Sequence, residues 1–357
     1  MEVSVVIPTY NEIENIKPLV EDIADQLEER SFEIIVVDDD SPDGTAEKVS
    51  NLQESWGFLR LVERKKMSGI GSAHRRGFRE AEGDLVVQMD ADFSHPPRYI
   101  PDLIDAVEAG ADVAVGSRYV EDGDRQDPLH RRVFPLIGSY LYRYGLGFPV
   151  KDFTSGFKVY RKEVLEEDMD NSLPDGFHFQ AASLLRIVED GYDVREVPIE
   201  FEERRAGDPK YSHMDLVKNA GFFGKKFLER NSKPIKFGVV GATGVAVNTS
   251  ILFALTEIYD LFYLFSSAVA VETSIIWNFL LNDSWTFASS GEDSLRSKLT
   301  RLGKFNSVSL VGLGINLSVL YVLTEFAGIY YLISNILAIM AVFIWNYIGN
   351  VAWTWPE

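Results

Sequence analysis

The sequence predicts a protein of two parts, an α/β domain built on a parallel sheet and a membrane domain of four helices. In the first part, short apolar strands alternate with segments of helical periodicity. In the second part, four long apolar stretches lie at residues 235–257, 261–282, 305–326 and 330–353. Each stretch reaches the ~20 residues that a helix needs to cross a bilayer. The alternative, buried helices of a soluble core, predicts shorter stretches with a charged outer face.

The composition excludes several classes of protein. The chain has 357 residues, 54 acidic and 35 basic side chains, a formal net charge of −19 and no cysteine. Without cysteine there is no disulfide scaffold, thiol nucleophile or cysteine zinc site. The acidic balance argues against a nucleic-acid partner, which needs a basic surface. Residues 235–357 hold only eight acidic and five basic side chains, so most of the net charge belongs to the first part.

The predicted strands of the first part end in polar residues. Continuous apolar strands separated by helices are typical of a parallel sheet that is covered on both faces. The predicted strands are residues 3–7, 33–37, 58–62 and 85–89, and the predicted helices are residues 13–30, 44–54 and 70–81. Ligands of such sheets bind beyond the carboxyl ends of the strands. We therefore expect the polar residues after the first, second and fourth strands to line one crevice.

Asp90-Ala91-Asp92 follows the fourth predicted strand. Two carboxylates at this position can hold a hard divalent cation, which bridges diphosphate oxygens and neutralises charge on a leaving group. In the alternative interpretation, these acids are solvated turn residues or cap the helix that begins near His95, which we take as a turn residue. The position directly after an apolar strand favours the cation site.

Asp38-Asp39-Asp40 follows the second predicted strand. Three adjacent carboxylates cannot all be buried as charges. At least one of them therefore faces water, a cation or a hydroxyl-rich ligand such as a ribose.

The distribution of basic residues predicts the membrane topology. Basic residues flank one end of the predicted spans, at Lys225, Lys226, Lys233, Lys236, Arg296, Lys298, Arg301 and Lys304. The short connections at residues 259–260 and 327–328 carry neither lysine nor arginine. By the positive-inside rule, the N-terminal domain, the middle loop and the C-terminus are expected on the cytoplasmic side.

The membrane part repeats itself with a period of 68 residues. The matching pairs include Lys236-Phe237 with Lys304-Phe305, Asn248 with Asn316, Trp277-Asn278 with Trp345-Asn346, and Trp285-Thr286 with Trp353-Thr354. Each unit holds two spans, so the units are expected to be parallel and related by an axis along the membrane normal. This pattern of two hairpins resembles the small GtrA-like membrane family.

Several polar residues lie inside the predicted spans, among them Asn248, Asn316 and Glu272. Asn248, Asn316 and Glu272 can be interpreted as polar contacts between helices. Glu272 also has a functional interpretation, because an ionisable residue near the middle of a membrane is a candidate functional residue. Its position in the second unit is occupied by Met340.

Residues 211–232 join the two parts and have an amphipathic pattern. Apolar residues such as Phe223 and Phe227 share one helical face, and Lys218, Lys225 and Arg230 lie on the other. The pattern fits a helix that lies in the membrane interface. It fits a helix that packs the two domains together equally well.

A series of motifs in the first part resembles glycosyltransferase family 2, whose catalytic domain has the GT-A fold. The motifs are Pro8-Thr9-Tyr10-Asn11-Glu12, residues 37–43, Met89-Asp90-Ala91-Asp92, Gly116-Ser117-Arg118-Tyr119, residues 152–157, residues 176–180 and residues 197–201. The resemblance covers about residues 3–225 and is strongest to the members that make dolichyl phosphate mannose. It implies a GT-A (Rossmann-like) nucleotide-sugar domain at residues 1–210, a linker helix at 211–232 and a GtrA-like transmembrane domain at 233–357.

The resemblance also implies roles for individual residues. The nucleotide pocket would be lined by Pro8, Tyr10, Glu12, Val37 and Asp39. The segment Asp90-Ala91-Asp92 would hold Mg²⁺ or Mn²⁺ and the donor diphosphate, with Ser94 as a weaker third metal ligand. Arg118 and Arg131 would contact the acceptor phosphate, and Arg204 and Lys210 would close over the donor, which Arg118 also borders. In the alternative interpretation, Arg131 and Arg204 belong to a solvated basic face near anionic lipid.

The implied function is a metal-dependent, inverting transfer of mannose from GDP-mannose to dolichyl (polyprenyl) phosphate. A phosphomonoester has a second pKa near ~6, so its attack needs no base at neutral pH. Asp92, Arg118 and Arg131 are the expected catalytic residues, and Asp152 is the fallback base. We expect a multi-pass protein of the plasma membrane with a cytoplasmic catalytic domain. Two alternatives stay open, a UDP-glucose donor and a translocase of lipid-linked sugars in the membrane part. A processive polysaccharide synthase is disfavoured because its Gln-x-x-Arg-Trp signature is absent.

Overall fold

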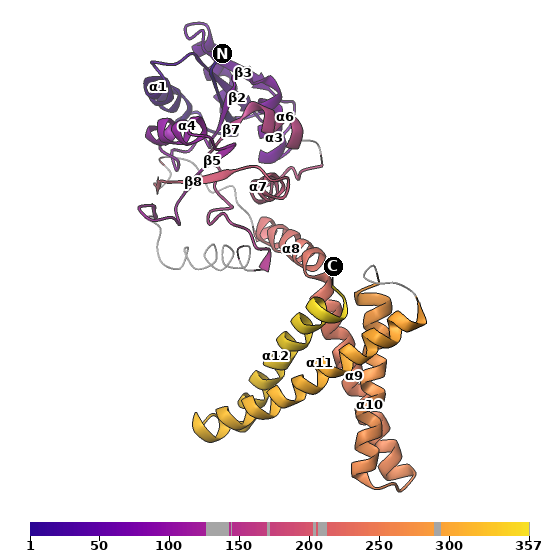
Figure 1. Cartoon of the computed structure of the whole chain (residues 1–357). Coiled ribbons are helices and arrows are strands. Elements are labelled where there is room, and N and C mark those ends of the chain that lie inside the picture. The colour runs from indigo at the N-terminus through magenta and orange to yellow at the C-terminus, as the bar shows by residue number, and fades with distance from the viewer. Residues whose placement is uncertain are drawn as a thin grey trace. The chain divides into compact units, whose positions relative to one another are not determined.

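The computed structural model describes residues 1–125, 143, 145–169, 172–202, 205, 213–288 and 294–356. The chain forms two compact units, Met1–Phe227 and Leu228–Glu357. Figure 1 shows the strands of the first unit and the long helices of the second.

A mixed sheet of seven strands forms the centre of the first unit, in the order β3-β2-β1-β4-β7-β5-β8. The strands are β1 (Val3–Thr9), β2 (Phe32–Asp38), β3 (Leu59–Glu63), β4 (Leu85–Gln88), β5 (Val113–Ser117), β7 (Lys158–Arg161) and β8 (Val194–Pro198). A separate two-stranded ribbon pairs β6 (Asp124–Arg125) with β9 (Glu200–Phe201). The four strands that the sequence predicts are confirmed.

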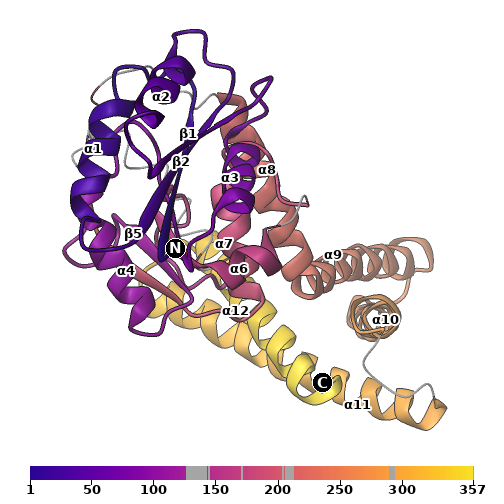
Figure 2. The same cartoon turned by 90° about the horizontal axis from the view of Figure 1, so that it is seen from above.

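Helices cover both faces of this sheet (Figure 2). The helices are α1 (Ile16–Gln26), α2 (Thr45–Gln53), α3 (Ile70–Glu80), α4 (Ile100–Glu108), α6 (Lys162–Asp168), α7 (Phe179–Glu189) and α8 (His213–Arg230), with a 3₁₀ turn at Pro97–Tyr99. Residues of α1, α2 and α4 join one hydrophobic core cluster, and residues of α3, α6 and α7 join a second on the opposite face. Because both faces are buried, the strands are apolar throughout.

The predicted strands β1 to β4 are parallel, and the complete sheet is mixed because it includes β7, a strand that the sequence analysis does not predict. This strand runs antiparallel between β4 and β5. Buried strands have the same apolar pattern in either direction, so the sequence does not reveal the reversal. Its consequence is functional: Lys158, the first residue of β7, pairs with Gln88 at the carboxyl end of β4. The residues that precede β7 are therefore brought to the edge where the polar segments gather.

Helix α1 begins at Ile16 and not at residue 13 as predicted, because the residues before Ile16 are held in a turn. The backbone N–H of Glu12 donates to Thr45 Oγ1 at 3.0 Å, and that of Ile13 donates to Asp43 Oδ2 at 3.1 Å. Asn11 has a left-handed backbone with φ of 56°. These bonds tie the end of β1 to the start of α2.

The apolar face of α8 packs on the first unit. Phe222, Phe223 and Phe227 are partly buried against the second core cluster. Lys226 Nζ lies 3.4 Å from Glu189 Oε2 of α7. These contacts hold residues 222–227 of α8 in the first unit.

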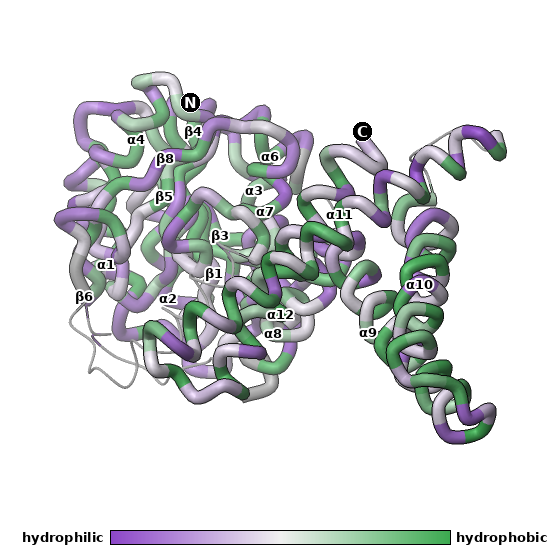
Figure 3. Tube along the Cα trace, turned by 60° about the horizontal axis from the view of Figure 1, so that its bottom comes forward, coloured by the Kyte–Doolittle hydropathy of each residue, from purple (hydrophilic) through white to green (hydrophobic). Residues whose placement is uncertain are grey.

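Four helices of the second unit are long and apolar enough to cross a membrane, at Ser232–Ile258, Tyr263–Thr286, Leu295–Phe326 and Tyr331–Thr354. They comprise α9 (Ser232–Phe253), α10 (Tyr263–Leu281), α11 (Leu295–Tyr321) and α12 (Tyr331–Gly349), each followed by a π-helical turn. Figure 3 shows the predominance of hydrophobic residues along α9 and α10. All four predicted spans are confirmed. Helix α11 begins at Leu295, before the predicted start at residue 305, because the helix includes the polar residues that precede the apolar stretch.

The repeat in the sequence is also a repeat in the structure. The π-helical turn at Ala254–Ile258 corresponds to that at Val322–Phe326, and the turn at Asn282–Thr286 corresponds to that at Asn350–Thr354. Thr286 donates to Asn282 in one turn and Thr354 to Asn350 in the other, at 2.8 and 2.7 Å. The two hairpins therefore share their local geometry as well as their residues.

Glu272 links the two hairpins. Its carboxylate accepts hydrogen bonds from Asn306 Nδ2 at 3.0 and 3.3 Å, which join α10 to α11. This contact supports the interpretation of Glu272 as a polar contact between helices.

In each hairpin a glycine lets the two helices approach closely. A Cβ on Gly244 would come within 2.2 Å of Asn278 Oδ1, and one on Gly312 within 2.6 Å of Asn346 Oδ1. Gly244 and Gly312 correspond to each other in the repeat, as do the two asparagines.

We expect Gly244→Ala and Gly312→Ala each to destabilise the second unit by about 1–3 kcal/mol, because the added methyl group forces the helices apart. The measurement is thermal unfolding of the full chain in detergent. Gly241→Ala and Gly314→Ala are matched controls, since a Cβ there meets no atom within 4 Å. Equal losses in the two pairs would show that close packing is not the cause.

Candidate active site

The carboxyl ends of β1, β2 and β4 meet at one edge of the sheet. Strand β1 lies between the other two and is parallel to both, with Thr9 paired to Asp38 and Val6 paired to Gln88. The polar segments after these strands therefore lie side by side, as the sequence predicts. The segment at residues 152–157 reaches the same edge because it precedes β7.

Asp38 holds the turn after β2 in place. Its carboxylate is buried and accepts hydrogen bonds from Thr9 Oγ1 at 2.9 Å, from the Ser41 N–H at 2.9 Å and from Ser41 Oγ at 2.6 Å. Asp40 is exposed and has a left-handed backbone with φ of 62°. The expectation that the three acids are not all buried is confirmed.

Asp39 is buried against an arginine that the sequence analysis did not identify. Arg64 Nε lies 2.5 Å from Asp39 Oδ1, and Arg64 Nη2 donates to Asp39 Oδ2 at 3.0 Å. Burial raises the pKa of Asp39, and the charge of Arg64 opposes that rise. The arginine thus supplies a fixed positive partner for a carboxylate at this edge of the sheet.

The other residues of the predicted nucleotide pocket differ in exposure. Glu12 is buried and accepts a hydrogen bond from Asn15 Nδ2 at 2.8 Å. Pro8 and Tyr10 are partly exposed at the end of β1. Val37 has no exposed surface and packs in the second core cluster, so any ligand contact there involves its backbone.

Asp90 and Asp92 lie in a tight turn after β4. Asp92 is buried, and its Oδ1 accepts a hydrogen bond from the N–H of Ser94 at 3.0 Å. The side chain of Asp90 is 30% exposed. Phe93, which lies between Asp92 and Ser94, has a left-handed backbone with φ of 63°. Ser94 is buried beside Asp92, and Ala91 is buried in the first core cluster.

His95 lies in a turn, as predicted, but its ring is buried below the acids. Its Nδ1 lies 3.6 Å from Asp90 Oδ2. The ring packs against Phe157 and Phe201, with centroid distances of 5.5 and 5.3 Å. Burial, together with the nearby charge of Arg118, lowers the pKa of His95 to about 4. The imidazole is therefore neutral at pH 7.

The two acids fit a divalent cation that completes its coordination with substrate. Among the residues that the structure describes, no group of three or more His, Asp or Glu side chains is placed to hold a metal ion. Mg²⁺ is commonly bound by one or two carboxylates together with phosphate oxygens and water, so a third protein ligand is not required. Space for such an ion depends on Gly156, because a Cβ there would lie 2.7 Å from Asp90 Oδ2.

We expect Gly156→Ala to weaken Mn²⁺ binding by about tenfold or more, because its methyl group would displace the Asp90 carboxylate. The measurement is titration of the full chain with Mn²⁺ in the presence of a nucleoside diphosphate, followed by electron paramagnetic resonance. Gly57→Ala is the control, since a Cβ at Gly57 meets no atom within 4 Å. Unchanged Mn²⁺ affinity in Gly156→Ala would mean that Asp90 does not bind the metal.

Arg118 is clamped by a buried carboxylate. Arg118 Nε and Nη2 each donate to Asp152 at 2.6 Å, and the Arg118 backbone N–H donates to the same carboxylate at 3.1 Å. Asp152 is fully buried. Burial alone would raise its pKa, but the charge and hydrogen bonds of Arg118 outweigh this and lower it. Asp152 is therefore committed to Arg118, which argues against its role as a base.

The clamp is itself supported by Glu196 of β8. The Glu196 carboxylate accepts hydrogen bonds from the backbone N–H groups of Lys151 and Asp152, both at 2.9 Å. A bidentate arginine–carboxylate pair has a fixed orientation, so this arrangement presents Arg118 rigidly.

A buried lysine lies behind the acids. Lys158 has no exposed surface, and its Nζ donates to Gln180 Oε1 at 2.7 Å. Gln88 Nε2 donates to the same oxygen at 2.6 Å. Burial lowers the pKa of Lys158 to about 7, although the charges of Asp90 and Asp152 act in the opposite direction. The sequence signal for this residue was available, since a lysine interrupts the apolar strand 157–160.

The remaining predicted residues, Arg131, Arg204 and Lys210, lie outside the described residues. Arg205 is described, and its backbone N–H donates to the Asp92 carbonyl at 3.4 Å. Its guanidinium lies 3.8 Å from the centroid of the Phe93 ring. The segment after β9 thus brings a cation to the acidic turn.

Two family models match the chain. The model described as "Glycosyl transferase family 2" matches residues 4–168, and the one described as "GtrA/DPMS, transmembrane domain" matches residues 236–355. A crystal structure of glucosyl-3-phosphoglycerate synthase from Mycobacterium tuberculosis has a similar fold, with a TM-score of 0.50 and 21% identity over 64% of this chain and 78% of that one.

Two curated relatives are more similar in sequence. The "Dolichol-phosphate mannosyltransferase" of Pyrococcus furiosus is 38% identical over 99% of both chains. The "Polyprenol monophosphomannose synthase" of Mycolicibacterium smegmatis is 40% identical over 59% of this chain and 82% of its own. The chain therefore belongs to the dolichol-phosphate mannosyltransferase group of glycosyltransferase family 2, and a GtrA/DPMS transmembrane domain follows its family 2 domain.

Proposed function

We propose that this glycosyltransferase transfers mannose from GDP-mannose to a polyprenyl phosphate such as dolichyl phosphate. The observation that carries the proposal is the arrangement of two acids and one clamped arginine at a single sheet edge: Asp90, Asp92 and Arg118. The acids suit a metal-bound diphosphate, and the arginine suits a second phosphate. The names of the two curated relatives support mannose as the sugar and a polyprenyl phosphate as the acceptor.

The roles of the residues follow from their contacts. Mg²⁺ or Mn²⁺ held by Asp90 and Asp92 supplies charge neutralisation at the diphosphate. Asp39, fixed by Arg64, would accept hydrogen bonds from the ribose of the donor. Arg118 orients the lipid phosphate, and Asp152 keeps Arg118 in place.

The reaction is an in-line displacement with inversion. An oxygen of the lipid phosphate forms a bond to C1 of mannose while the bond from C1 to the diphosphate breaks, and GDP leaves with the electron pair. No proton has to be removed from the acceptor, because a phosphomonoester with a second pKa near ~6 is largely a dianion at neutral pH. Positioning and electrostatic stabilisation therefore carry the catalysis.

The cellular arrangement is part of the proposal. The four apolar helices and the family match make the chain a membrane protein. The lysine and arginine residues around the spans support a catalytic domain on the cytoplasmic side, where a nucleotide sugar is available, and we place the protein in the plasma membrane.

The donor is tested with the purified full chain in detergent, dolichyl phosphate and Mn²⁺. Labelled GDP-mannose and labelled UDP-glucose are compared, and label in extractable lipid is measured with and without a chelator. We expect metal-dependent label from GDP-mannose alone. Label from UDP-glucose alone would overturn the assignment of mannose as the sugar. Transfer that persists in the presence of chelator would overturn the requirement for a metal ion.

A further inference from the structure

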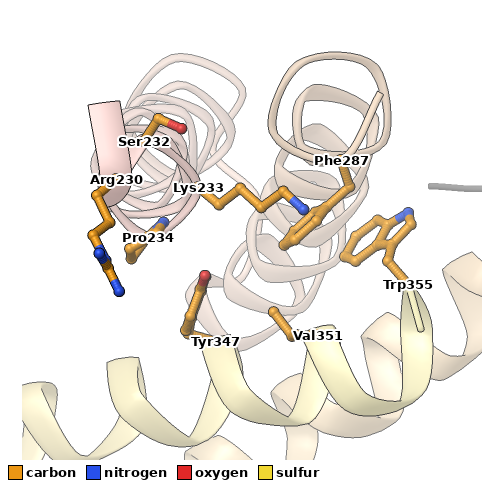
Figure 4. Close-up of a pocket in the computed structure, with 8 residues that line it drawn as sticks. All are labelled: Arg230, Ser232, Lys233, Pro234, Phe287, Tyr347, Val351 and Trp355. Carbon is orange, nitrogen blue, oxygen red and sulfur yellow. The ribbon is translucent and has the colours of Figure 1, made fainter. Parts of the chain in front are cut away.

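The second unit contains a cavity of about 330 Å³ that differs in chemistry from the candidate active site (Figure 4). Its lining includes two basic residues, Arg230 and Lys233, and three aromatic residues, Phe287, Tyr347 and Trp355. No aspartate, glutamate or histidine is among the described residues that line it. The cavity therefore does not suit a divalent cation, and the acidic turn after β4 stays the candidate metal site.

His95 is a buried imidazole beside that turn, and the proposed mechanism does not use it. Its side chain is 4% exposed, and neither ring nitrogen has a hydrogen-bond partner among the residues that the structure describes. Buried polar side chains nearly always have such a partner, because an unpaired group bears the full penalty of its removal from water. The unpartnered ring therefore points to a hydrogen bond that forms in another state of the site.

The ring nitrogen Nδ1 of His95 faces the carboxylate of Asp90. Nδ1 lies 3.6 Å from Asp90 Oδ2. A hydrogen bond between nitrogen and oxygen normally measures about 2.7–3.2 Å, so the gap has to close by only about 0.5 Å. The last torsion of an aspartate side chain is broad, so a rotation of the Asp90 carboxylate can close it. A Cβ on Gly156 would lie 2.7 Å from the same oxygen. Gly156 and the imidazole thus border one carboxylate oxygen.

Neighbours from other parts of the chain hold the ring of His95 in place. It packs against Phe157, which directly precedes β7, and against Phe201 of β9. The backbone N–H of Glu202, which follows Phe201, donates at 3.2 Å to the carbonyl of the residue before His95. The side chain of Asp90 is 30% exposed and therefore less confined. A hydrogen bond between the two groups thus forms by movement of the carboxylate toward a fixed donor.

We propose that His95 is a positioning residue for the metal site, whose Nδ1–H donates a hydrogen bond to Asp90 Oδ2 when a divalent cation is bound. This role rests on the proposed function, in which Asp90 binds the cation. Carboxylates that bind a metal ion are themselves held by hydrogen bonds, and removal of such a partner typically lowers metal affinity about 10–100-fold. An imidazole carries at least one N–H in either protonation state, so a donor is available whatever the charge of the ring.

His74 of α3 provides an internal comparison for His95. It is fully buried, and its two ring nitrogens also have no hydrogen-bond partner within the described part of the chain. Its ring stacks on Phe78 and Phe179, with centroid distances of 5.8 and 6.0 Å. The ring of His95 has aromatic neighbours as well, but its Nδ1 faces a carboxylate. The same substitution at both positions therefore separates the effect on Asp90 from the effect of changing a buried ring.

The test measures Mn²⁺ affinity of the purified full chain by electron paramagnetic resonance in the presence of GDP, with thermal unfolding of the same samples. His95→Phe keeps a ring and removes both nitrogens, so we expect Mn²⁺ affinity to fall about tenfold or more. Its unfolding temperature should stay the same or rise, because the new ring has no unpaired polar group. His95→Asn keeps a donor near Nδ1 but loses the ring packing. We expect it to unfold at a lower temperature and to bind Mn²⁺ more tightly than His95→Phe.

The two measurements thus rank the His95 variants in opposite orders, which a merely structural role of the ring would not produce. His74→Phe is the matched control and is expected to bind Mn²⁺ as the wild type does. If His95→Phe does not fold, His95→Leu takes its place in the comparison, because leucine has nearly the shape of asparagine without its donor.

Three outcomes overturn the role of His95 alone. They are wild-type Mn²⁺ affinity in His95→Phe, an affinity of His95→Asn no higher than that of His95→Phe, and an equal loss in His74→Phe. In each of them the wild type still binds Mn²⁺, so the metal site of the proposed function is retained. A wild-type chain that binds no Mn²⁺ in the presence of GDP would overturn that metal site, and the role of His95 with it.

Discussion

Replacing Asp92 with asparagine is expected to lower kcat/KM for sugar transfer about a thousandfold or more and to leave the fold intact. The carboxylate is buried in the turn after β4, and in the proposed function it would hold a cation at the diphosphate. Losing such a ligand removes several kcal/mol of transition-state stabilisation, and each ~1.4 kcal/mol changes the rate tenfold. The amide oxygen of asparagine can still accept the hydrogen bond from the Ser94 N–H, so the turn is expected to persist.

Asp40→Asn is the matched control for Asp92→Asn. It makes the same chemical change in a neighbouring segment of the site, but its side chain is exposed. We expect it to keep most of the activity. Mn²⁺ affinity should fall in Asp92→Asn and not in Asp40→Asn. Wild-type Mn²⁺ affinity in Asp92→Asn would contradict the assignment of Asp92 as a metal ligand.

Asp152→Asn is expected to have the second-largest effect, through Arg118. The buried carboxylate accepts three hydrogen bonds from Arg118, and asparagine would leave the guanidinium without its charge partner. Breaking a buried ion pair by removing one partner costs about 3–5 kcal/mol of stability. Because Arg118 would lose its orientation, KM for the lipid phosphate should rise strongly. The measurements are thermal unfolding and steady-state kinetics with acceptor as the varied substrate.

Asp112→Asn and the pH–rate profile separate positioning from base catalysis. Asp112 lies 4.0 Å from Arg161 in a pair that is one-third exposed on both sides, so its replacement should cost less than about 1 kcal/mol. If Asp152 only positions Arg118, the pH–rate profile of Asp152→Asn keeps its shape. A fall in kcat at unchanged acceptor KM, with loss of the acidic limb of the profile, would instead make Asp152 the base.

The sequence predicts the sheet edge that carries the site because apolar strands and the polar residues after them are local patterns. β1, β2 and β4 appear as predicted, and Asp90 and Asp92 follow β4. The partners of these residues are distant in sequence and are therefore not visible as patterns. Arg64 reaches Asp39 from after β3, and Asp152 reaches Arg118 because β7 enters the sheet in reverse.

Burial explains the other residues that sequence reasoning missed. The sequence predicts the turn at His95, but the burial of its ring depends on Phe157 and Phe201, which come from other parts of the chain. Lys158 stands in an apolar strand, but its environment is set by Gln88 and Gln180. The membrane repeat was predicted from identical residues. The ion pair of Arg301 with Asp283 is not repeated in the sequence, because Val351 stands 68 residues after Asp283.

The most direct test of the proposed chemistry compares two acceptors that differ only in the phosphate. Purified full chain is incubated with labelled GDP-mannose and Mn²⁺, together with either dolichyl phosphate or dolichol, and label in the lipid extract is measured over time. We predict label with dolichyl phosphate and none with dolichol, because in the proposed function the acceptor supplies its own anionic nucleophile and Arg118 would orient its phosphate. Comparable transfer to dolichol would contradict the account, since an alcohol acceptor requires a base that this site does not provide among its described residues.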